Sequence, residues 1–376
     1  MSIESAVRAR YSEGASTRVE ALCCPVDYDP RYLAILPQEV LDRDYGCGDP
    51  SRYVREGDVV LDLGSGGGKI CFIAQQIVGR TGSVIGVDMN PDMLDLARRS
   101  APTVATTLGY DNVVFKRGRI QDLATDLDAI DARLARAPIG SADDLLAFEA
   151  WKAETKMIPD NSIDVVVSNC VLNLVDDAHK PQLLREIFRV LKVGGRIAIS
   201  DIISDEVAPQ ALRDDPELWT GCISGAFQEE ELLTMLEEVG FHGIMLDKWE
   251  KEPWQTVQGI EFRSATVTGR KGKQGPCFEA NQAVIYRGPW RQVQDDDGHV
   301  LKRGERTAVC AKTFGLLTSD PYAAQVIGIE PLTTIQEDER GEFDCTRTRA
   351  RHPRESKGMQ YDVTKAGPSC GSEGCC

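Results

Sequence analysis

A short apolar segment followed at once by a cluster of glycines constrains this chain more than any other feature. Residues 58–62 are mostly apolar and β-branched, and Gly64, Gly66 and Gly68 come directly after them. Apolar residues recur on one face of residues 67–78, which predicts a helix. A strand that passes through glycines into a helix is typical of the first unit of a parallel sheet covered by helices.

The alternation of strand and helix continues along the chain. Residues 83–88 are expected to form a second strand, and Asn90-Pro91 opens the next helix, because proline is favoured in the first helical turn. The later strands are expected at 113–115, 163–167 and 195–200, and the later helices at 124–156 and 178–191. The expected fold class is therefore α/β, with a doubly wound Rossmann-like sheet.

Changes in composition divide the chain into four expected parts. Residues 1–50 form an N-terminal segment whose cysteine-bearing loops could act as a lid, and residues 51–252 form the sheet domain. Residues 253–335 contain short strand patterns separated by turn signals, which predicts a small, mainly β C-terminal domain. Residues 336–376 are polar with scattered glycines, and this tail is expected to be disordered.

The charge balance excludes one class of partner. The chain has 43 basic and 59 acidic residues and a net charge of −16, so it should repel phosphate backbones, and no nucleic-acid partner is expected. The first residues mix both charges without an apolar block, so no secretory signal is expected. No apolar run is long enough to predict a membrane span. A cytoplasmic localisation is expected, where the 12 cysteines should stay reduced.

The glycine loop differs from two other nucleotide-binding loops. A P-loop requires Ser or Thr after its lysine, but Ile70 follows Lys69, and the dinucleotide fingerprint requires glycine where Lys69 stands. The spacing Gly64-x-Gly66-x-Gly68 resembles instead the first motif of S-adenosylmethionine-dependent methyltransferases, in which missing side chains let the backbone approach the cofactor. Asp88, at the end of the second strand, could accept hydrogen bonds from both ribose hydroxyls.

The candidate cofactor residues fall after the first four strands. In the methyltransferase superfamily, the segment that corresponds to 118–122 lies beside the adenine. The candidates are Asp62, Gly64, Gly66, Gly68, Asp88, Met89, Ile120, Gln121 and Asn169. Glycine-rich turns alone are common, but a strand, loop, helix, strand and acidic residue in this order favour a cofactor site at the carboxyl edge of the sheet.

Three cysteines stand in loops around the same expected edge. Cys47 lies between two glycines, Cys170 follows the strand 163–167, and Cys222 lies in a loop bracketed by glycines. If the fold brings them together, three thiolates would favour a soft, thiophilic centre such as trivalent arsenic. The alternative is that reduced cysteines simply fill the core. That is the interpretation for Cys71, and structural or incidental roles are expected for Cys277, Cys310 and Cys345.

A zinc site is the competing interpretation of the cysteines. Structural zinc sites combine ligands paired at short spacing with a fourth ligand. The sequence has no Cys-x-x-Cys pair, and its four histidines are scattered. The pattern therefore disfavours zinc.

Together, these motifs resemble the arsenite methyltransferase family from Cys23 to about residue 332. The segments that carry the resemblance are Cys23-Cys24, Tyr45–Gly48, Asp62–Gly68, Gly86–Met89, Ser168–Leu174, Gly221–Ala226 and Ala283–Pro289. The resemblance implies a class I methyltransferase sheet, S-adenosylmethionine as cofactor, and trivalent arsenic bound by Cys47, Cys170 and Cys222. It also implies that Cys23 or Cys24 exchanges disulfides during turnover, with thioredoxin or glutathione as the thiol reductant.

The expected function is S-adenosylmethionine-dependent methylation of arsenite, or of its thiol adducts, to methyl- and dimethylarsenicals, which would serve arsenic detoxification. Two alternatives stay open: a methyltransferase that acts on O, N or C of a small organic molecule, and a non-catalytic, thiol-based metalloid-binding protein. Cys370, Cys375 and Cys376 lie outside the resemblance and could capture arsenic or be inert surface residues.

Overall fold

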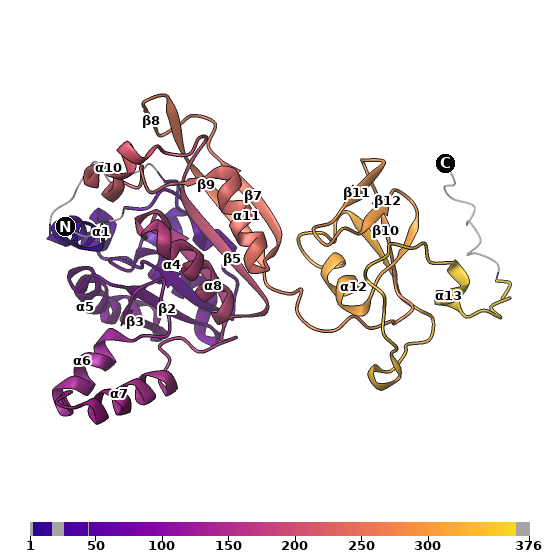
Figure 1. Cartoon of the computed structure of the whole chain (residues 1–376), viewed down its shortest axis with the longest axis horizontal. Coiled ribbons are helices and arrows are strands. Elements are labelled where there is room, and N and C mark those ends of the chain that lie inside the picture. The colour runs from indigo at the N-terminus through magenta and orange to yellow at the C-terminus, as the bar shows by residue number, and fades with distance from the viewer. Residues whose placement is uncertain (1–2, 17–25, 44, 366–376) are drawn as a thin grey trace. The chain divides into compact units, whose positions relative to one another are not determined.

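The computed structural model describes residues 3–16, 26–43 and 45–365 (Figure 1). Two compact units divide the chain, the first ending at Gly272 and the second beginning at Lys273. The first unit contains the large sheet and the helices that cover it. The second unit contains small antiparallel sheets and short helices.

The large sheet has the order β3-β2-β1-β4-β5-β9-β7, with β6 paired to β5 and β8 paired to β9. Strands β1 to β5 are parallel, whereas β9 runs antiparallel to β5 and β7. The strands are β1 Val59–Leu63, β2 Ser83–Asp88, β3 Val113–Arg117, β4 Ile163–Asn169, β5 Leu191–Ser204, β6 Phe227–Gln228, β7 His242–Trp249, β8 Gln255–Val257 and β9 Ile260–Arg270. The expected α/β class with a doubly wound sheet is confirmed.

Helices cover both faces of this sheet. The helices of the first unit are α1 Ile3–Ser16, α2 Pro30–Leu33, α3 Gln38–Asp42, α4 Lys69–Val78, α5 Pro91–Leu108, α6 Leu127–Arg136, α7 Ala142–Glu154, α8 Lys180–Val190, α9 Gln210–Arg213, α10 Pro216–Thr220 and α11 Glu229–Val239. The sequence sets both ends of α5, because Asn90 caps its first turn and Gly109 ends it in a left-handed conformation. Helices α6 and α7 bury no residue and lie away from the sheet (Figure 1).

Alternate residues of each central strand supply two separate apolar cores. Leu61 and Leu63 of β1 pack with α8 and α11 on one face, and Val60 packs with α4 and α5 on the other. Strand β5 divides in the same way, with Ile197 on the first face and Ala198 on the second. This division follows from the two-residue period of a strand.

The second unit has its own core around a three-stranded antiparallel sheet of order β13-β10-β14. Its elements are β10 Ala283–Tyr286, β11 Gln292–Gln294, β12 Val300–Lys302, β13 Arg306–Ala308, α12 Ala311–Leu317, β14 Val326–Ile329 and α13 Pro353–Lys357. Tyr286, Phe314 and Val326 lie at the centre of this core. The expected mainly β character of the C-terminal region agrees with this arrangement.

The boundary between the units lies about twenty residues beyond the expected one at 252/253. Residues 260–270 were expected to belong to the second domain, but they form β9, which pairs with β5 from Arg196↔Arg270 to Ser204↔Phe262. The reason is that β5 has an edge beyond β4 that a further strand must cover.

The segment 336–365 is also different from the expected disordered tail. Residue Ala350 bridges to Thr307 of β13, and the Arg351 side chain is 1% exposed, with ion pairs to Glu279 at 2.7 Å and Glu355 at 3.1 Å. The polar composition that suggested disorder therefore supplies a buried ionic network. The terminal cysteines Cys370, Cys375 and Cys376 lie outside the described residues.

Among the described residues, every helix is too short or too polar to cross a lipid bilayer.

Replacing Arg351 with alanine should destabilise the second unit by about 2–3 kcal/mol, because Glu279 and Glu355 lose their buried partner and keep only the partly exposed Arg349. Hydrogen exchange of β13 and β14 under increasing urea would measure this loss. The matched control is Arg347→Ala, since the Arg347 side chain is 86% exposed, and it should change stability by less than about 0.5 kcal/mol. Equal effects of the two substitutions would contradict the packing of this segment.

Candidate functional site

A cavity of about 290 Å³ lies at the carboxyl ends of β1, β2 and β4. Ligands of open α/β sheets bind at this edge, next to the point where the strand order reverses between β1 and β4. Of the expected cofactor residues, those that line the cavity are Asp62, Gly64, Gly66, Asp88, Met89, Ile120, Gln121 and Asn169. Gly68 does not line it; this residue caps the start of α4 at φ 90°.

The glycine loop is shaped by two contacts. Gly64 has φ 69°, and a Cβ atom there would lie 2.3 Å from Val171, so only glycine fits between β1 and the loop after β4. The carboxylate of Asp88 accepts hydrogen bonds from the backbone N–H groups of Gly66 at 2.9 Å and Asn90 at 2.8 Å. Burial raises the pKa of Asp88, and these hydrogen bonds oppose that shift.

The lining residues fit a polar cofactor of the nucleoside type. The Oγ atom of Ser65 is buried against the cavity and has no hydrogen-bond partner among the described residues. Buried hydroxyls are normally satisfied, so this one is suited to a ligand. The lining thus combines an acceptor carboxylate, an unsatisfied hydroxyl and a glycine loop, which is the chemistry that the nucleoside part of S-adenosylmethionine requires.

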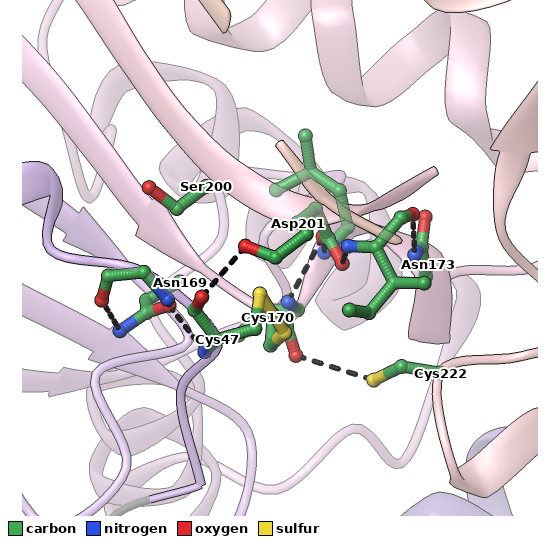
Figure 2. The surroundings of a disulfide bond; sticks show 12 residues. Cys47, Asn169, Cys170, Asn173, Ser200, Asp201 and Cys222 are labelled. Atoms are coloured by element: carbon green, nitrogen blue, oxygen red, sulfur yellow. Dashed lines mark hydrogen bonds between the residues drawn. A yellow bond between two sulfur atoms is a disulfide. The ribbon is translucent and has the colours of Figure 1, made fainter. Parts of the chain in front are cut away.

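Two of the three candidate cysteines are covalently joined (Figure 2). A disulfide links Cys47 and Cys170, with Cα atoms 5.8 Å apart, in the range usual for disulfides. The structure therefore contradicts the expectation that all cysteines stay reduced. The loops before β1 and after β4 bring these residues to one point although they are 123 positions apart in the sequence.

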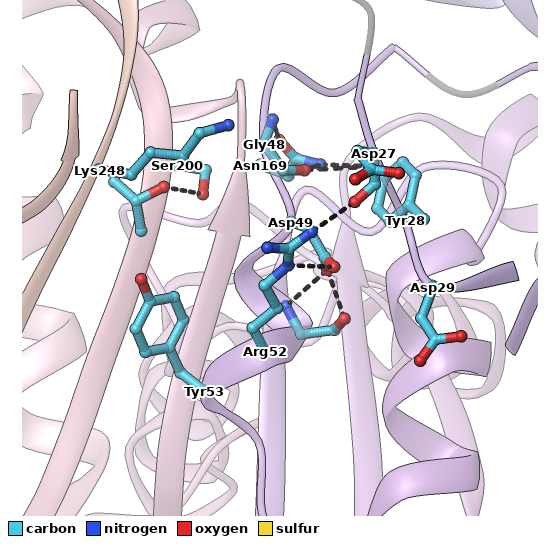
Figure 3. A network of polar contacts seen from close by, with 12 residues as sticks. Asp27, Tyr28, Asp29, Gly48, Asp49, Arg52, Tyr53, Asn169, Ser200 and Lys248 are labelled. Atoms are coloured by element: carbon cyan, nitrogen blue, oxygen red, sulfur yellow. Dashed lines mark hydrogen bonds and ion pairs between the residues drawn. The ribbon is translucent and has the colours of Figure 1, made fainter. Parts of the chain in front are cut away.

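Asn169, the last residue of β4, holds the Cys47 loop in place (Figure 3). Its Oδ1 accepts from the backbone N–H groups of Cys47 at 2.9 Å and Gly48 at 3.0 Å. Its Nδ2 donates to the Tyr28 hydroxyl at 3.0 Å and the Gly48 carbonyl at 2.8 Å. A Cβ atom on Gly46 would lie 2.0 Å from this amide, so glycine is required there. Asn169 was expected to contact the cofactor. It lines the cavity, and its side-chain amide is hydrogen-bonded to the backbone of the Cys47 loop.

Asp201, which the sequence did not single out, fixes the Cys170 loop from the other side (Figure 2). Its carboxylate accepts from the backbone N–H groups of Val171 at 3.1 Å, Leu172 at 2.9 Å and Ile202 at 2.8 Å. One of its oxygens and the sulfurs of Cys47 and Cys170 lie within 4.8 Å of one another. Burial raises the pKa of Asp201 to about 6, and the backbone hydrogen bonds oppose this shift.

Cys222 is buried next to the disulfide and is not disulfide-bonded itself. Its Sγ lies 3.5 Å from the carbonyl oxygen of Cys170, outside the tight group formed by the two bonded sulfurs and Asp201. Both Cys170 and Cys222 have positive φ, 57° and 60°. Such backbone is costly for residues other than glycine and concentrates at functional sites.

Helix α1 closes one side of the cavity, a role that the sequence did not reveal. Glu4, Val7, Arg8 and Tyr11 of this helix line the cavity. The Tyr11 hydroxyl is hydrogen-bonded to Cys222, and burial, followed by this contact, raises the pKa of Tyr11. Arg10, the neighbour of Tyr11 in the same helix, donates a 2.9 Å hydrogen bond to Thr220, which precedes the Cys222 loop.

The remaining expected site cysteines divide into two groups. Cys23 and Cys24 lie outside the described residues. Cys71 is fully buried in α4, and its thiol donates to Asp62 at 3.2 Å, which agrees with the core role expected for it.

Comparisons with known proteins establish the family. The chain is 32% identical to an arsenite methyltransferase of Aquipseudomonas alcaligenes over 83% of this chain and 85% of that protein. It is 30% identical to the Homo sapiens arsenite methyltransferase over 78% of this chain and 73% of that protein. This chain belongs to the arsenite methyltransferase family.

Structural and domain comparisons agree with the family. An arsenic (III) S-adenosylmethionine methyltransferase from Chlamydomonas reinhardtii superposes with a TM-score of 0.54 at 27% identity, covering 85% of this chain and 100% of that one. A methyltransferase domain matches residues 55–240, and a domain of unknown function matches residues 273–361. The second match begins where the second compact unit begins.

Replacing Asp201 with asparagine should change how stability depends on pH. Because the pKa of about 6 in the folded chain exceeds the unfolded value of about 3.9, the folded state binds the extra proton between these values. The contribution of Asp201 to the unfolding free energy therefore falls as pH rises through this range, by up to about 3 kcal/mol.

Urea unfolding of the first unit at several pH values from 4 to 7.5 would test this expectation. The stability of the wild type minus that of Asp201→Asn should fall as pH rises. Parallel profiles for the two proteins would mean that Asp201 does not carry a raised pKa.

Proposed function

We propose that this chain methylates trivalent arsenic bound by Cys47, Cys170 and Cys222, with S-adenosylmethionine as the methyl donor. The observation that carries the proposal is the convergence of these three cysteines, from loops far apart in the sequence, beside the cavity that the glycine loop lines. The membership of the chain in the arsenite methyltransferase family supports the same substrate. Asp62, Gly64, Gly66, Asp88, Met89, Ile120 and Gln121 are proposed to hold the cofactor.

Arsenic binding requires the disulfide between Cys47 and Cys170 to open. Two electrons and two protons convert it to two thiols, and we propose thioredoxin or glutathione as their source. The thiols of Cys47, Cys170 and Cys222 then replace the three hydroxides of arsenite and release three waters. The short separation of Cys222 from the Cys170 loop means that a small movement of its side chain completes the set.

The bound arsenic keeps a lone pair, which is the nucleophile. S-adenosylmethionine supplies an electrophilic methyl group on a sulfonium. The protein need not provide a general base, because the arsenic donates a lone pair and loses no proton. Asn169 and Asp201 hold the two cysteine loops in fixed positions. The arsenic ligands are therefore oriented before the reaction, and less entropy is lost on reaching the transition state.

Methyl transfer raises arsenic formally from the trivalent to the pentavalent state. Two thiols can return the product to the trivalent state, because they give two electrons to arsenic as they form a disulfide. No other reductant is needed for this step. The Cys47–Cys170 disulfide is the product that such a step would leave on the protein. Cys23 or Cys24 is proposed to exchange with it during turnover.

Replacing Cys222 with serine should lower kcat/KM for arsenite by at least about 100-fold, because the third soft ligand is lost and the arsenic is misplaced. Separation of arsenic species after incubation with arsenite, thiol and S-adenosylmethionine would measure this. Calorimetric binding of S-adenosylmethionine should be unchanged. Activity near that of the wild type would refute the proposed ligand set and favour a methyltransferase for organic nucleophiles.

The matched control is Ser224→Ala in the same loop. The Oγ of Ser224 is buried and has no hydrogen-bond partner among the described residues, so its removal should leave methylation intact. A loss as large as that of Cys222→Ser would show that the loop is merely sensitive to any substitution.

Cys47→Ser should separate the two methylation steps. Arsenite needs three thiolates, whereas methylarsenite has only two exchangeable ligands and can bind Cys170 and Cys222 alone. We expect loss of arsenite methylation, with methylarsenite turnover within about an order of magnitude of the wild type. Equal loss on both substrates would contradict this order of binding.

A further inference from the structure

The second unit brings together three cysteines that the sequence gave no reason to connect. The sulfur atoms of Cys277, Cys310 and Cys345 lie within 4.8 Å of one another. Hydrogen bonds link each of the three thiols to the other two. They were expected to be structural or incidental, and their convergence from three separate segments was not predicted.

The backbone that carries these cysteines is tied together by hydrogen bonds. The N–H of Phe343 donates to the Cys277 carbonyl at 2.9 Å, and the N–H of Ala311 donates to the Phe278 carbonyl at 2.9 Å. Phe278 also bridges to Glu342. These contacts join the three segments that carry the thiols.

Each cysteine is placed for binding in a different way. Cys310 is fully buried beside Ala308 and Phe343, and its sulfur accepts from the Thr313 N–H at 3.3 Å and is hydrogen-bonded to the Thr313 hydroxyl at 3.2 Å. Cys277 and Cys345 are only partly buried, so the cluster has access to solvent. The imidazole of His299 is hydrogen-bonded to the carbonyl oxygen of Cys345 at 3.2 Å and is not one of the ligand atoms grouped with the three sulfurs.

We propose that Cys277, Cys310 and Cys345 form a second binding site for trivalent arsenic, in which three thiolates hold one arsenic atom. Soft sulfur ligands favour a thiophilic centre over Mg²⁺ or Ca²⁺. Structural zinc requires four ligands, and among the described residues no His, Asp or Glu joins the three sulfurs. The choice of arsenic among thiophilic centres rests on the proposed function.

Binding at this site is an exchange without a redox step. Arsenite gives up three hydroxides, the three thiols give up three protons, and three waters leave. Arsenic stays trivalent and its lone pair occupies the fourth direction, so no further protein ligand is needed. A thiol adduct of arsenite would exchange its three thiols in the same way.

The test uses the full chain with every cysteine outside the cluster replaced by serine except Cys71, which lies in the core. The replaced residues are Cys23, Cys24, Cys47, Cys170, Cys222, Cys370, Cys375 and Cys376. After reduction with a phosphine, the protein is incubated with arsenite, desalted and analysed for arsenic per chain by mass spectrometry. We expect one equivalent of arsenic, and its absence would overturn the proposal.

Single substitutions identify the ligands. Cys277→Ser and Cys345→Ser, at partly buried positions, should each weaken arsenite binding at least tenfold, and Cys310→Ser should do the same if its melting temperature shows that it folds. Cys71→Ser in the same background is the matched control and should retain the arsenic. Retention by the first two variants, or loss by the control, would overturn the assignment.

Two further outcomes would also overturn it. One is a tightly held equivalent of zinc that arsenite does not displace. The other is a disulfide within the cluster that persists under the reductant, detected as a mass lower by two hydrogens. The assay contains no S-adenosylmethionine, so its result is independent of whether Cys222→Ser abolishes methylation.

Discussion

The side-chain amide of Asn169 is the interaction on which the site depends. One amide satisfies two N–H groups and one carbonyl of the Cys47 loop, and it also binds the Tyr28 hydroxyl. The loop before β1 has no regular structure of its own at Cys47, so these bonds fix its path. Because Asn169 is also the residue before Cys170, one side chain sets the separation between both cysteines.

The opposite side of the site is held by groups that are costly to bury. Asp201 keeps a carboxylate at 2% exposure, and Cys170 and Cys222 adopt backbone conformations that L-residues avoid. The packing of the surrounding sheet and helices must offset the free-energy cost of these three residues. The apolar cores on both faces of β1, β4 and β5 lie directly beneath the site and provide it. The architecture is therefore stable at the sheet and strained at its edge.

The parts of the site that sequence could predict are those encoded locally. The glycine loop and Asp88 are defined by residues within one strand–helix–strand unit. Eight of the nine cofactor candidates, all except Gly68, line the cavity, and the order of the strands was enough to predict them. The roles of Asp201 and Tyr11, and the disulfide between Cys47 and Cys170, depend on which distant segments come into contact in the fold. No local sequence pattern predicts those contacts. The ion pairs of Arg351 and the cluster of Cys277, Cys310 and Cys345 could not be predicted for the same reason. Arg351 lies in a polar segment, and the three cysteines are far apart in the sequence.

Strand β9 has a consequence for how this protein can be divided. It enters the sheet last in sequence, yet it lies between β5 and β7 and runs against β5 along most of that strand's length. A fragment that stops at residue 252 would leave β5 and β7 each with an open row of amide and carbonyl groups, and such rows recruit other chains. Any catalytic fragment that remains dispersed in solution must therefore extend through Arg270.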